Sequence, residues 1–453
     1  MNKFVLVMGL LLLGCRVFAF DVVYPAKNDA IINSKSTFFI GSSNKPLKIN
    51  GKNIPLHQTG AFAYVVDLNI GENTFILQSE DERQVFVITR PKVNPEPLKS
   101  APFTLYNKQK LLVVTTEDAP LRSNPVDSGI NRIAHLQRDV ELISDGEQGG
   151  FYRIVLGDKN FGWMSKSNVK TAENNSPTLA QLFGYEFLDS KEFYTFVFHL
   201  DKKVPFEMVE GENFQIKLYN IKEQPAGTYV MNVPINDVLS TRKLLGYSGK
   251  YSGNDFILKI RKPLSTHSWR PLHNIRIAVD AGHGGYENGA TGCLGDKEKD
   301  INLKIAQYLQ AELKKRGAKV IMTRNGDNYV SLKDRVEIAN YGDAVVFLSI
   351  HGNALPDGSN PNEHRGTSIY YYHNQAKPLA DIIMDTIVSE IGVPNDKVRQ
   401  GSLAVVRNTN ALSLLVEVSY LINPEDNANL VNPEFQKQYA KAIADSLEKY
   451  FSN

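Results

Sequence analysis

Four ionisable residues in the last third of the chain have the types that metal-assisted hydrolysis requires. His283 lies in AVDAGHGG, Glu298 in DKEKDINLK, His351 in LSIHGNA and Glu417 in LLVEVSYLINPED. Two imidazoles and one carboxylate are ligands that a catalytic zinc ion uses, and a second carboxylate can accept a proton from the attacking water. The four residues therefore indicate a zinc hydrolase as a candidate class.

Both histidines are expected at the carboxyl ends of buried strands. Residues 275–280 are apolar and β-branched, and they run into the glycine-rich turn that carries His283. Residues 344–350 have the same character and end directly before His351. Two parallel strands would bring the imidazoles side by side.

The two glutamates have different settings. Glu298 is expected near the start of an amphipathic helix, because apolar residues recur at four-residue spacing from Ile301 to Leu313 and Gly317 follows as a stop signal. From there it can reach the carboxyl edge of the sheet, where open α/β folds hold their sites. Glu417 has apolar neighbours in a strand expected to be buried, and a buried carboxylate without a partner is costly.

Each residue also has an ordinary structural interpretation. A single histidine after a strand is more often a turn or packing residue than a ligand, and Glu298 alone would be an acidic residue that favours a helix N-terminus. The pairing of His283 with His351 and the apolar setting of Glu417 favour the functional interpretation.

The segments HGGYENGATG, KEKDINL, TRNGD, LKDRVEIAN, SIHGNA and LVEVSYLINPED, in this order, resemble the zinc-dependent N-acetylmuramoyl-L-alanine amidases that cleave bacterial peptidoglycan. The resemblance covers about residues 274–453. It implies that His283, Glu298 and His351 bind one zinc ion and that Glu417 is the catalytic glutamate. The expected fold is an α/β catalytic domain whose mostly parallel, twisted sheet is flanked by helices, preceded by three small all-β modules.

The bond that the resemblance implies is the amide between the lactyl group of N-acetylmuramic acid and L-alanine. Glu417 would take the proton of the water and deliver it to the leaving amine. Asn353, Arg324 and Arg335 are further candidates for substrate contact, and each has an alternative as a structural hydrogen-bond donor or an exposed charge.

This sequence departs from the family pattern in ways that bear on substrate fit and control. Ser419 and Tyr420 stand where Gly-Phe is usual, and Glu287 stands where Asp is usual. Some members carry a long helical insertion after the second zinc-binding histidine that blocks the site. Here only residues 352–367 separate His351 from the next expected strand, so we expect control by localisation instead.

Two other functions fit the same residues. A zinc peptidase that cuts peptide cross-links of peptidoglycan would keep every zinc residue, and the amine newly formed in its product would distinguish it. A non-enzymatic wall-binding or regulatory protein would keep the fold, but the complete set of four site residues argues against it.

The first residues predict export. Lys3 is followed by an apolar run over residues 4–14, which is shorter than the roughly 20 residues that a membrane span needs and is typical of a secretory signal. We expect a signal peptide over residues 1–19 and a place in the periplasm or cell envelope. The alternative is a lipid anchor at Cys15, and without Cys15 the single remaining cysteine, Cys293, can form no intramolecular disulfide.

The amino-acid composition gives little information about binding partners. With a net charge of +2 and 42% hydrophobic residues among 453, the chain gives no argument for nucleic acid and suggests only a mild attraction to anionic wall polymers. Nothing in the sequence identifies a protein activator.

Three β modules are expected before the enzyme. Alternating patterns and turn signals predict an immunoglobulin-like sandwich over residues 21–90. Residues 104–172 resemble a bacterial Src-homology-3-like barrel, and residues 179–265 are similar in outline to the wall-targeting module of exported amidases. These modules would hold the enzyme on peptidoglycan, although polar sheet faces are by default only solvated.

Overall fold

The computed structural model describes residues 19–80, 82–92, 101–157, 160–172, 176–222, 224–235, 238, 243–266 and 268–452. The predicted cleavage region up to residue 18 and Cys15 lie outside these residues. Within these ranges, none of the helices combines the length and apolar character that a membrane crossing requires.

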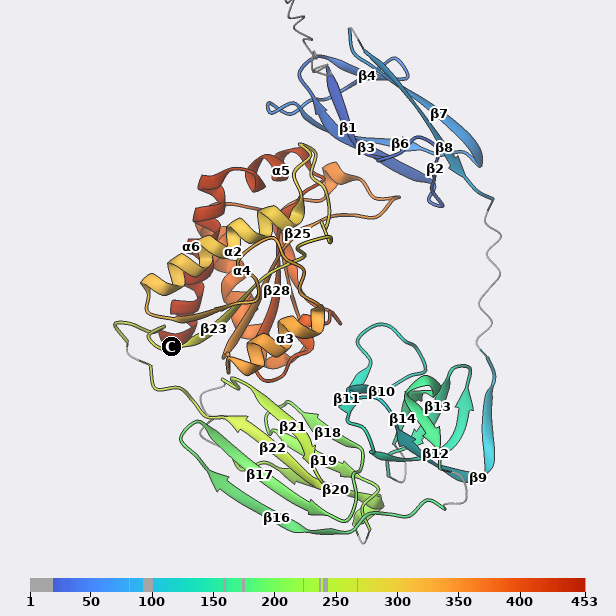
Figure 1. Cartoon of the computed structure of the whole chain (residues 1–453), viewed down its shortest axis with the longest axis vertical. Coiled ribbons are helices and arrows are strands. Elements are labelled where there is room, and N and C mark those ends of the chain that lie inside the picture. Colours follow the sequence, from blue (N-terminus) through green and yellow to red (C-terminus); the bar gives the residue numbers. More distant parts are fainter. Residues whose placement is uncertain are drawn as a thin grey trace, which may run out of the picture.

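The N-terminal region is rich in β-sheets and the C-terminal part is an α/β domain, as the sequence predicts (Figure 1). We call residues 20–90 the first β unit; it has a three-stranded sheet, β1-β3-β6, and a five-stranded sheet, β2-β8-β7-β4-β5. The strands are β1 (Phe20–Tyr24), β2 (Ala30–Ile31), β3 (Ser36–Ser43), β4 (Leu47–Ile49), β5 (Lys52–Ile54), β6 (Ala61–Asp67), β7 (Gly71–Gln78) and β8 (Arg83–Arg90).

Residues 103–171 form a seven-stranded sheet, which we call the second β unit, and residues 182–261 form a four-stranded and a three-stranded sheet, the third β unit. One hydrophobic core runs through both units, from Leu112 and Met164 to Phe198 and Ile260. Their strands are β9 (Phe103–Val114), β10 (Ala119–Arg122), β11 (Arg132–Leu136), β12 (Glu141–Gln148), β13 (Phe151–Val155), β14 (Phe161–Ser165), β15 (Val169–Thr171), β16 (Leu182–Asp189), β17 (Phe193–Leu200), β18 (Phe206–Val209), β19 (Gln215–Tyr219), β20 (Thr228–Asn232), β21 (Tyr247–Ser252) and β22 (Asp255–Arg261).

Strand β3 of the first β unit is buried on both faces. On the inner face, the Phe39 ring packs edge-on against Phe75 and Phe86, with ring centroids 5.5 and 5.3 Å away. On the outer face, Phe38 and Ile40 join a cluster with Cys293 and Ile422 of the C-terminal domain. The first β unit is therefore packed against the loops of that domain, as Figure 1 shows at the α5 end.

The C-terminal sheet has the order β24-β23-β25-β28-β26-β27. All neighbouring strands are parallel except β26 and β28, which are antiparallel. Its elements are β23 (Arg276–Ala281), α2 (Glu298–Lys315), β24 (Lys319–Met322), α3 (Leu332–Tyr341), β25 (Val346–Asn353), β26 (Thr367–Tyr371), α4 (Lys377–Ile391), β27 (Asn395–Gln400), β28 (Leu412–Tyr420), α5 (Pro424–Leu430) and α6 (Pro433–Ser452).

Helices cover both faces of this sheet. On one face, α2, α4 and α6 pack on side chains such as Val279 and Leu348. On the other, α3 packs on Phe347 and Leu415. Helix α2 buries the residues from Ile301 to Leu313 that carry its four-residue repeat, and it ends at Lys315, before the left-handed Gly317.

Strand alternation decides on which face of the sheet the candidate site residues His351 and Glu417 lie. Successive side chains of a strand point to opposite faces, and Phe347 and Leu415 are on the α3 face. His351 comes four residues after Phe347 on β25, and Glu417 comes two residues after Leu415 on the paired strand β28. Each side chain therefore points to the same face as the earlier residue. Both side chains are therefore placed on the α3 face of the sheet, at its carboxyl edge.

Candidate metal centre

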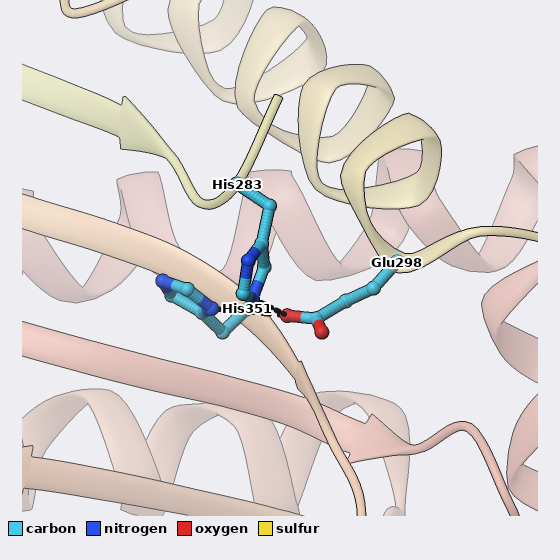
Figure 2. Close-up of side chains that lie close together, drawn as sticks. All are labelled: His283, Glu298 and His351. Carbon is cyan, nitrogen blue, oxygen red and sulfur yellow. Dashed lines mark hydrogen bonds and ion pairs between the residues drawn. The ribbon is translucent and has the colours of Figure 1, made fainter. Parts of the chain in front are cut away.

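Three of the residues singled out in the sequence converge on one point. Oε1 of Glu298 lies 3.1 Å from Nε2 of His283 and 3.0 Å from Nδ1 of His351, as Figure 2 shows. The two imidazole rings are nearly perpendicular, with centroids 4.9 Å apart. One nitrogen or oxygen from each side chain falls within 4.8 Å of the other two. The loop after β23, the first turn of α2 and the end of β25 supply one residue each.

Glycines allow the loops to close this tightly. A Cβ atom on Gly282 would lie 2.2 to 2.6 Å from ring atoms of His351, and one on Gly289 would lie 2.3 Å from Oε2 of Glu298. His283 itself has φ of 59°, in the left-handed region, which is uncommon for a residue with a side chain. The glycine-rich sequence around His283 is thus needed for the approach of the ligands.

Glu298 is held by neighbours as well as by the histidines. Its Oε2 accepts a hydrogen bond from the backbone N–H of Ala290 at 2.8 Å, and its Oε1 accepts from Asn302 Nδ2 and the N–H of Gly352, both at 3.2 Å. Burial alone would raise the pKa of Glu298, but the hydrogen bonds and positive charge of the two histidines outweigh it and hold the pKa far below its usual range. The carboxylate is therefore ionised and oriented.

The pKa of His351 depends on the carboxylates of Glu298 and Glu417. Burial alone would lower its pKa, but the hydrogen bond to Glu298 and the negative charges of Glu298 and Glu417 raise it above its ordinary value. The site is thus electrostatically negative and attracts a cation or a proton.

Glu417 lies beside the cluster without belonging to it. It is the register partner of His351 on β28, and its Oε2 is buried with no hydrogen-bond partner among the described residues. Burial raises the pKa of Glu417 to about 7, against the opposing effect of His351. A buried oxygen without a partner is costly in a native protein, so this one is available for a bound water or substrate.

The donor set fits a zinc ion. Two imidazole nitrogens and one carboxylate oxygen with an open fourth position are the ligands of catalytic zinc. Tetrahedral bonds of about 2.0–2.1 Å place ligand atoms about 3.4 Å apart. The Oε1 atom of Glu298 lies 3.1 and 3.0 Å from the nitrogens of His283 and His351. Small rotations of the side chains would admit the ion.

The two arginines proposed as substrate contacts lie inside the scaffold. Arg324 is 3% exposed and donates to the carbonyls of Ala281, Gly282 and Lys299. Arg335 is 2% exposed and donates to Asp280 and to the carbonyl of His283. These contacts favour the structural alternative, because both guanidinium groups hold the loop that carries His283.

Asn353, two residues after His351, is half-buried, and His364, in the loop between β25 and β26, is exposed. The side-chain oxygen of Asn353 accepts from the N–H of Ala354 at 2.8 Å, and its carbonyl accepts from the N–H of Leu421. His364 packs its ring near Tyr420, with centroids 6.1 Å apart. Cys293 is fully buried, and its pKa is raised above the ordinary thiol range by burial, so it is a packing residue rather than a ligand of the cluster.

The sequence did not reveal a set of polar residues on β26 and β27, the two strands that follow β28 in the sheet order. Ser368 is the antiparallel register partner of Glu417, and its hydroxyl donates to Asp396 at 2.8 Å. Asp396 also accepts from Arg399 and from the Tyr420 hydroxyl. No motif marks these residues, because their proximity arises from the reversal of β26 within the sheet.

Comparison with known proteins gives a family. Residues 277–449 match the family model described as N-acetylmuramoyl-L-alanine amidase. The probable cell wall amidase LytH of Staphylococcus aureus is 40% identical over 190 residues, which are 42% of this chain and 62% of LytH. This chain thus spans 62% of the length of the curated relatives it matches.

Solved structures include similar chains. The amidase AmiC2 of Nostoc punctiforme is 34% identical, with 42% of this chain and all of that chain covered at a TM-score of 0.38. The catalytic domain of CwlV from Bacillus (Paenibacillus) polymyxa var. colistinus is also 34% identical, with 39% and 97% covered at a TM-score of 0.37. On the family model and the sequence identity to LytH, the C-terminal part of this chain is a domain of the N-acetylmuramoyl-L-alanine amidase family.

Proposed function

We propose that this chain is a zinc-dependent peptidoglycan amidase that hydrolyses the amide between the lactyl group of N-acetylmuramic acid and L-alanine. The observation that carries the proposal is the convergence of His283, Glu298 and His351 beside the unpartnered carboxylate oxygen of Glu417. The family of the domain and the name of its relative LytH, a probable cell wall amidase, support the same reaction.

His283, Glu298 and His351 would hold the zinc ion. When bound, zinc supplies a water of lowered pKa and a Lewis acid for the scissile carbonyl. His283 and His351 hold the pKa of Glu298 low, and hydrogen bonds from the backbone N–H groups of Ala290 and Gly352 orient its carboxylate. Its position at the first turn of α2 fixes it against the two strand ends.

Glu417 would move the proton. Its free carboxylate oxygen accepts a proton from the attacking water and then delivers it to the nitrogen of the leaving L-alanine, which amide cleavage requires. Its register pairing with His351 on the central strand β28 sets the backbone separation of the two residues. Asn353 is the remaining candidate for direct substrate contact, since Arg324 and Arg335 act through the His283 loop.

Because the proposed substrate is peptidoglycan, the enzyme must work outside the cytoplasm. We infer that the chain is exported through the secretory signal over residues 1–19 and works in the periplasm or cell envelope, by soluble export rather than by a lipid anchor at Cys15. The three β modules, over residues 21–90, 104–172 and 179–265, would serve to hold the enzyme on the wall. The composition offers no case for a nucleic-acid partner.

Digestion of purified peptidoglycan by the full-length mature protein tests the proposal. We expect free stem peptides with an N-terminal L-alanine, detected by mass spectrometry, and their loss after chelation with recovery on adding zinc. Shortened peptides still attached to glycan would instead identify a cross-link peptidase. No released product from zinc-loaded protein would leave a binding or regulatory function.

A further inference from the structure

We infer that the chain has a second ligand site, an anion-binding site between the second β unit and the C-terminal domain, and that this site takes a phosphate group. Arg122 and Arg132 contribute from the second β unit, where the backbone of Arg132 contacts the Tyr372 hydroxyl. Arg407 contributes from the C-terminal domain, directly after Val405 and Val406, which share an apolar cluster with Tyr372. The inference is independent of the proposed amidase reaction.

Two of the arginines face each other directly. Arg122 on β10 and Arg132 on β11 are antiparallel register partners, and like charges in this relation destabilise a sheet. Arg122 is 3% exposed, and it donates to Asn131 and Asp127 at 3.1 and 2.5 Å. The Nε atoms of Arg122 and Arg132 are both buried and have no hydrogen-bond partner in the part of the chain that the structure describes.

The third arginine comes from the C-terminal domain. Arg407 ends the short 3-10 helix η5 (Val405–Arg407), and its guanidinium donates to the carbonyl of Ser402 at 2.7 Å. The Tyr372 hydroxyl bonds the backbone N–H and carbonyl of Arg132 at 3.3 and 3.5 Å, which ties the two domains together here. In Figure 1, β10 and β11 lie on the side of the second β unit turned toward the C-terminal domain.

Negative charge is scarce at this junction. Within the described ranges, neither Arg132 nor Arg407 has a carboxylate partner, and the Asp127 side chain that pairs with Arg122 is 81% exposed. The half-buried Glu210 lies beside Nδ1 of His373, and its oxygens accept hydrogen bonds from the Tyr247 hydroxyl and the N–H of Gln375. The junction thus has an excess of positive charge.

The titration of the groups at the junction agrees with this geometry. Burial, followed by the charges of Arg132 and Arg122, lowers the pKa of Arg407 to about 10. Burial and the neighbouring arginines lower the pKa of His135 to about 3. Both lowered pKa values mean that positive charge is unfavourable at this junction. A bound anion would make it more favourable.

A phosphate suits the donors best. Guanidinium forks match the several oxygens of a phosphate, and charge-assisted hydrogen bonds of this kind are the strong ones. The source is either free phosphate or a phosphodiester of an anionic polymer, which share this chemistry.

The site is remote from the metal centre. Tyr372 follows the carboxyl end of β26, whereas Ser368 near the other end faces Glu417. Four residues of extended strand separate them by about 13 Å. A ligand here would bridge two parts of the chain without entering the candidate metal centre.

Thermal unfolding of the zinc-loaded full-length protein tests the inference, in sodium phosphate, sodium acetate and sodium chloride at equal ionic strength. We expect phosphate alone to raise the Tm, by about 3 °C or more at saturation. Arg132→Gln and Arg407→Gln should each abolish this phosphate-specific shift while folding normally in chloride. Arg138→Gln, on the same unit but paired with Glu117 at 3.7 Å, should retain it.

Titration calorimetry then separates the two sources. Binding of poly(glycerol phosphate), but not of neutral dextran, that Arg407→Gln weakens at least ten-fold would assign a phosphodiester polymer. Binding of phosphate without binding of the polymer would assign the free ion. Equal Tm values in phosphate and chloride, or a phosphate shift that survives both substitutions, would overturn the site.

Discussion

His351 and Glu417 are register partners on the adjacent parallel strands β25 and β28. Adjacent strands lie about 4.8 Å apart, so a proposed metal ligand and the proposed proton acceptor lie on one rigid pair of strands. Glu298, in contrast, reaches this pair from a helix. The backbone positions of His351 and Glu417 are therefore set by the sheet rather than by a loop.

Replacing Glu417 with Gln should remove the proton acceptor and leave the metal centre in place. General acid–base catalysis contributes about 10²–10⁴-fold to rate, so we expect amidase activity to fall by about that factor with zinc content unchanged. Mass spectrometry of the products and metal analysis of the same sample measure the two effects. Glu425→Gln, an exposed glutamate on α5, is the matched control, and activity retained by Glu417→Gln would exclude the assigned role.

Gly282→Ala should damage the metal centre through His351. The new methyl group would lie 2.2 to 2.6 Å from atoms of the His351 ring, so the ring must move. We expect zinc affinity to fall at least 10-fold, as for other changes that misorient a ligand, measured by competition with a chromogenic chelator. Gly326→Ala, whose nearest atom would be 3.8 Å away, should bind zinc like the wild type.

Asp357→Ala should loosen the first β unit from the C-terminal domain. Asp357 accepts hydrogen bonds from the Tyr24 hydroxyl at 2.8 Å and the Thr37 hydroxyl at 2.6 Å. Loss of a charged acceptor leaves Thr37, which is fully buried, without its partner and costs about 1–3 kcal/mol. Hydrogen exchange should become faster in β6 and in residues 354–363.

The control for Asp357→Ala is Glu363→Ala in the same loop, where the carboxylate accepts only a local hydrogen bond from Asn360 among the described contacts. Unchanged exchange in Asp357→Ala would mean that the apolar cluster alone holds the two parts together.

His373 should make stability depend on pH. Burial lowers its pKa to about 4, while an unfolded histidine has a pKa of about 6.5. The unfolded chain therefore binds the proton first, and the stabilisation present above pH 6.5 is lost as the pH falls toward 4. Between pH 7 and pH 5 the free energy of unfolding should drop by about 2 kcal/mol from this residue.

Urea unfolding of wild type and His373→Gln at several pH values measures that drop, and the difference between the two slopes isolates the histidine from Glu210, which lies 3.7 Å away. If both proteins show the same slope between pH 7 and pH 5, the neutral buried state of His373 is wrong.

Local sequence signals were enough to predict the centre and the elements that carry it. Apolar runs with abrupt glycine turns predicted the strands ending at His283 and His351, and the four-residue repeat predicted α2, which starts at Glu298 itself. These signals act over a few residues, where periodicity and backbone sterics dominate.

Relations between distant segments could not be predicted in this way. The reversal of β26 brings Ser368 to Glu417, and the roles of Arg324 and Arg335 depend on carbonyl groups more than 40 residues away in the chain. The shared core of the second and third β units likewise depends on surface matching between sheets. Residue composition and motif spacing do not predict such long-range contacts.

Because β3 is buried on both faces, the first β unit cannot be freely exchanged for a unit from another protein. A β unit from another protein that has polar side chains at the positions of Phe38 and Ile40 would leave Cys293 and Ile422 without their apolar cover. Such a chimera would hydrate an apolar surface and favour aggregation. The first β unit and the catalytic domain must therefore be inherited and engineered as a matched pair, not as interchangeable cassettes.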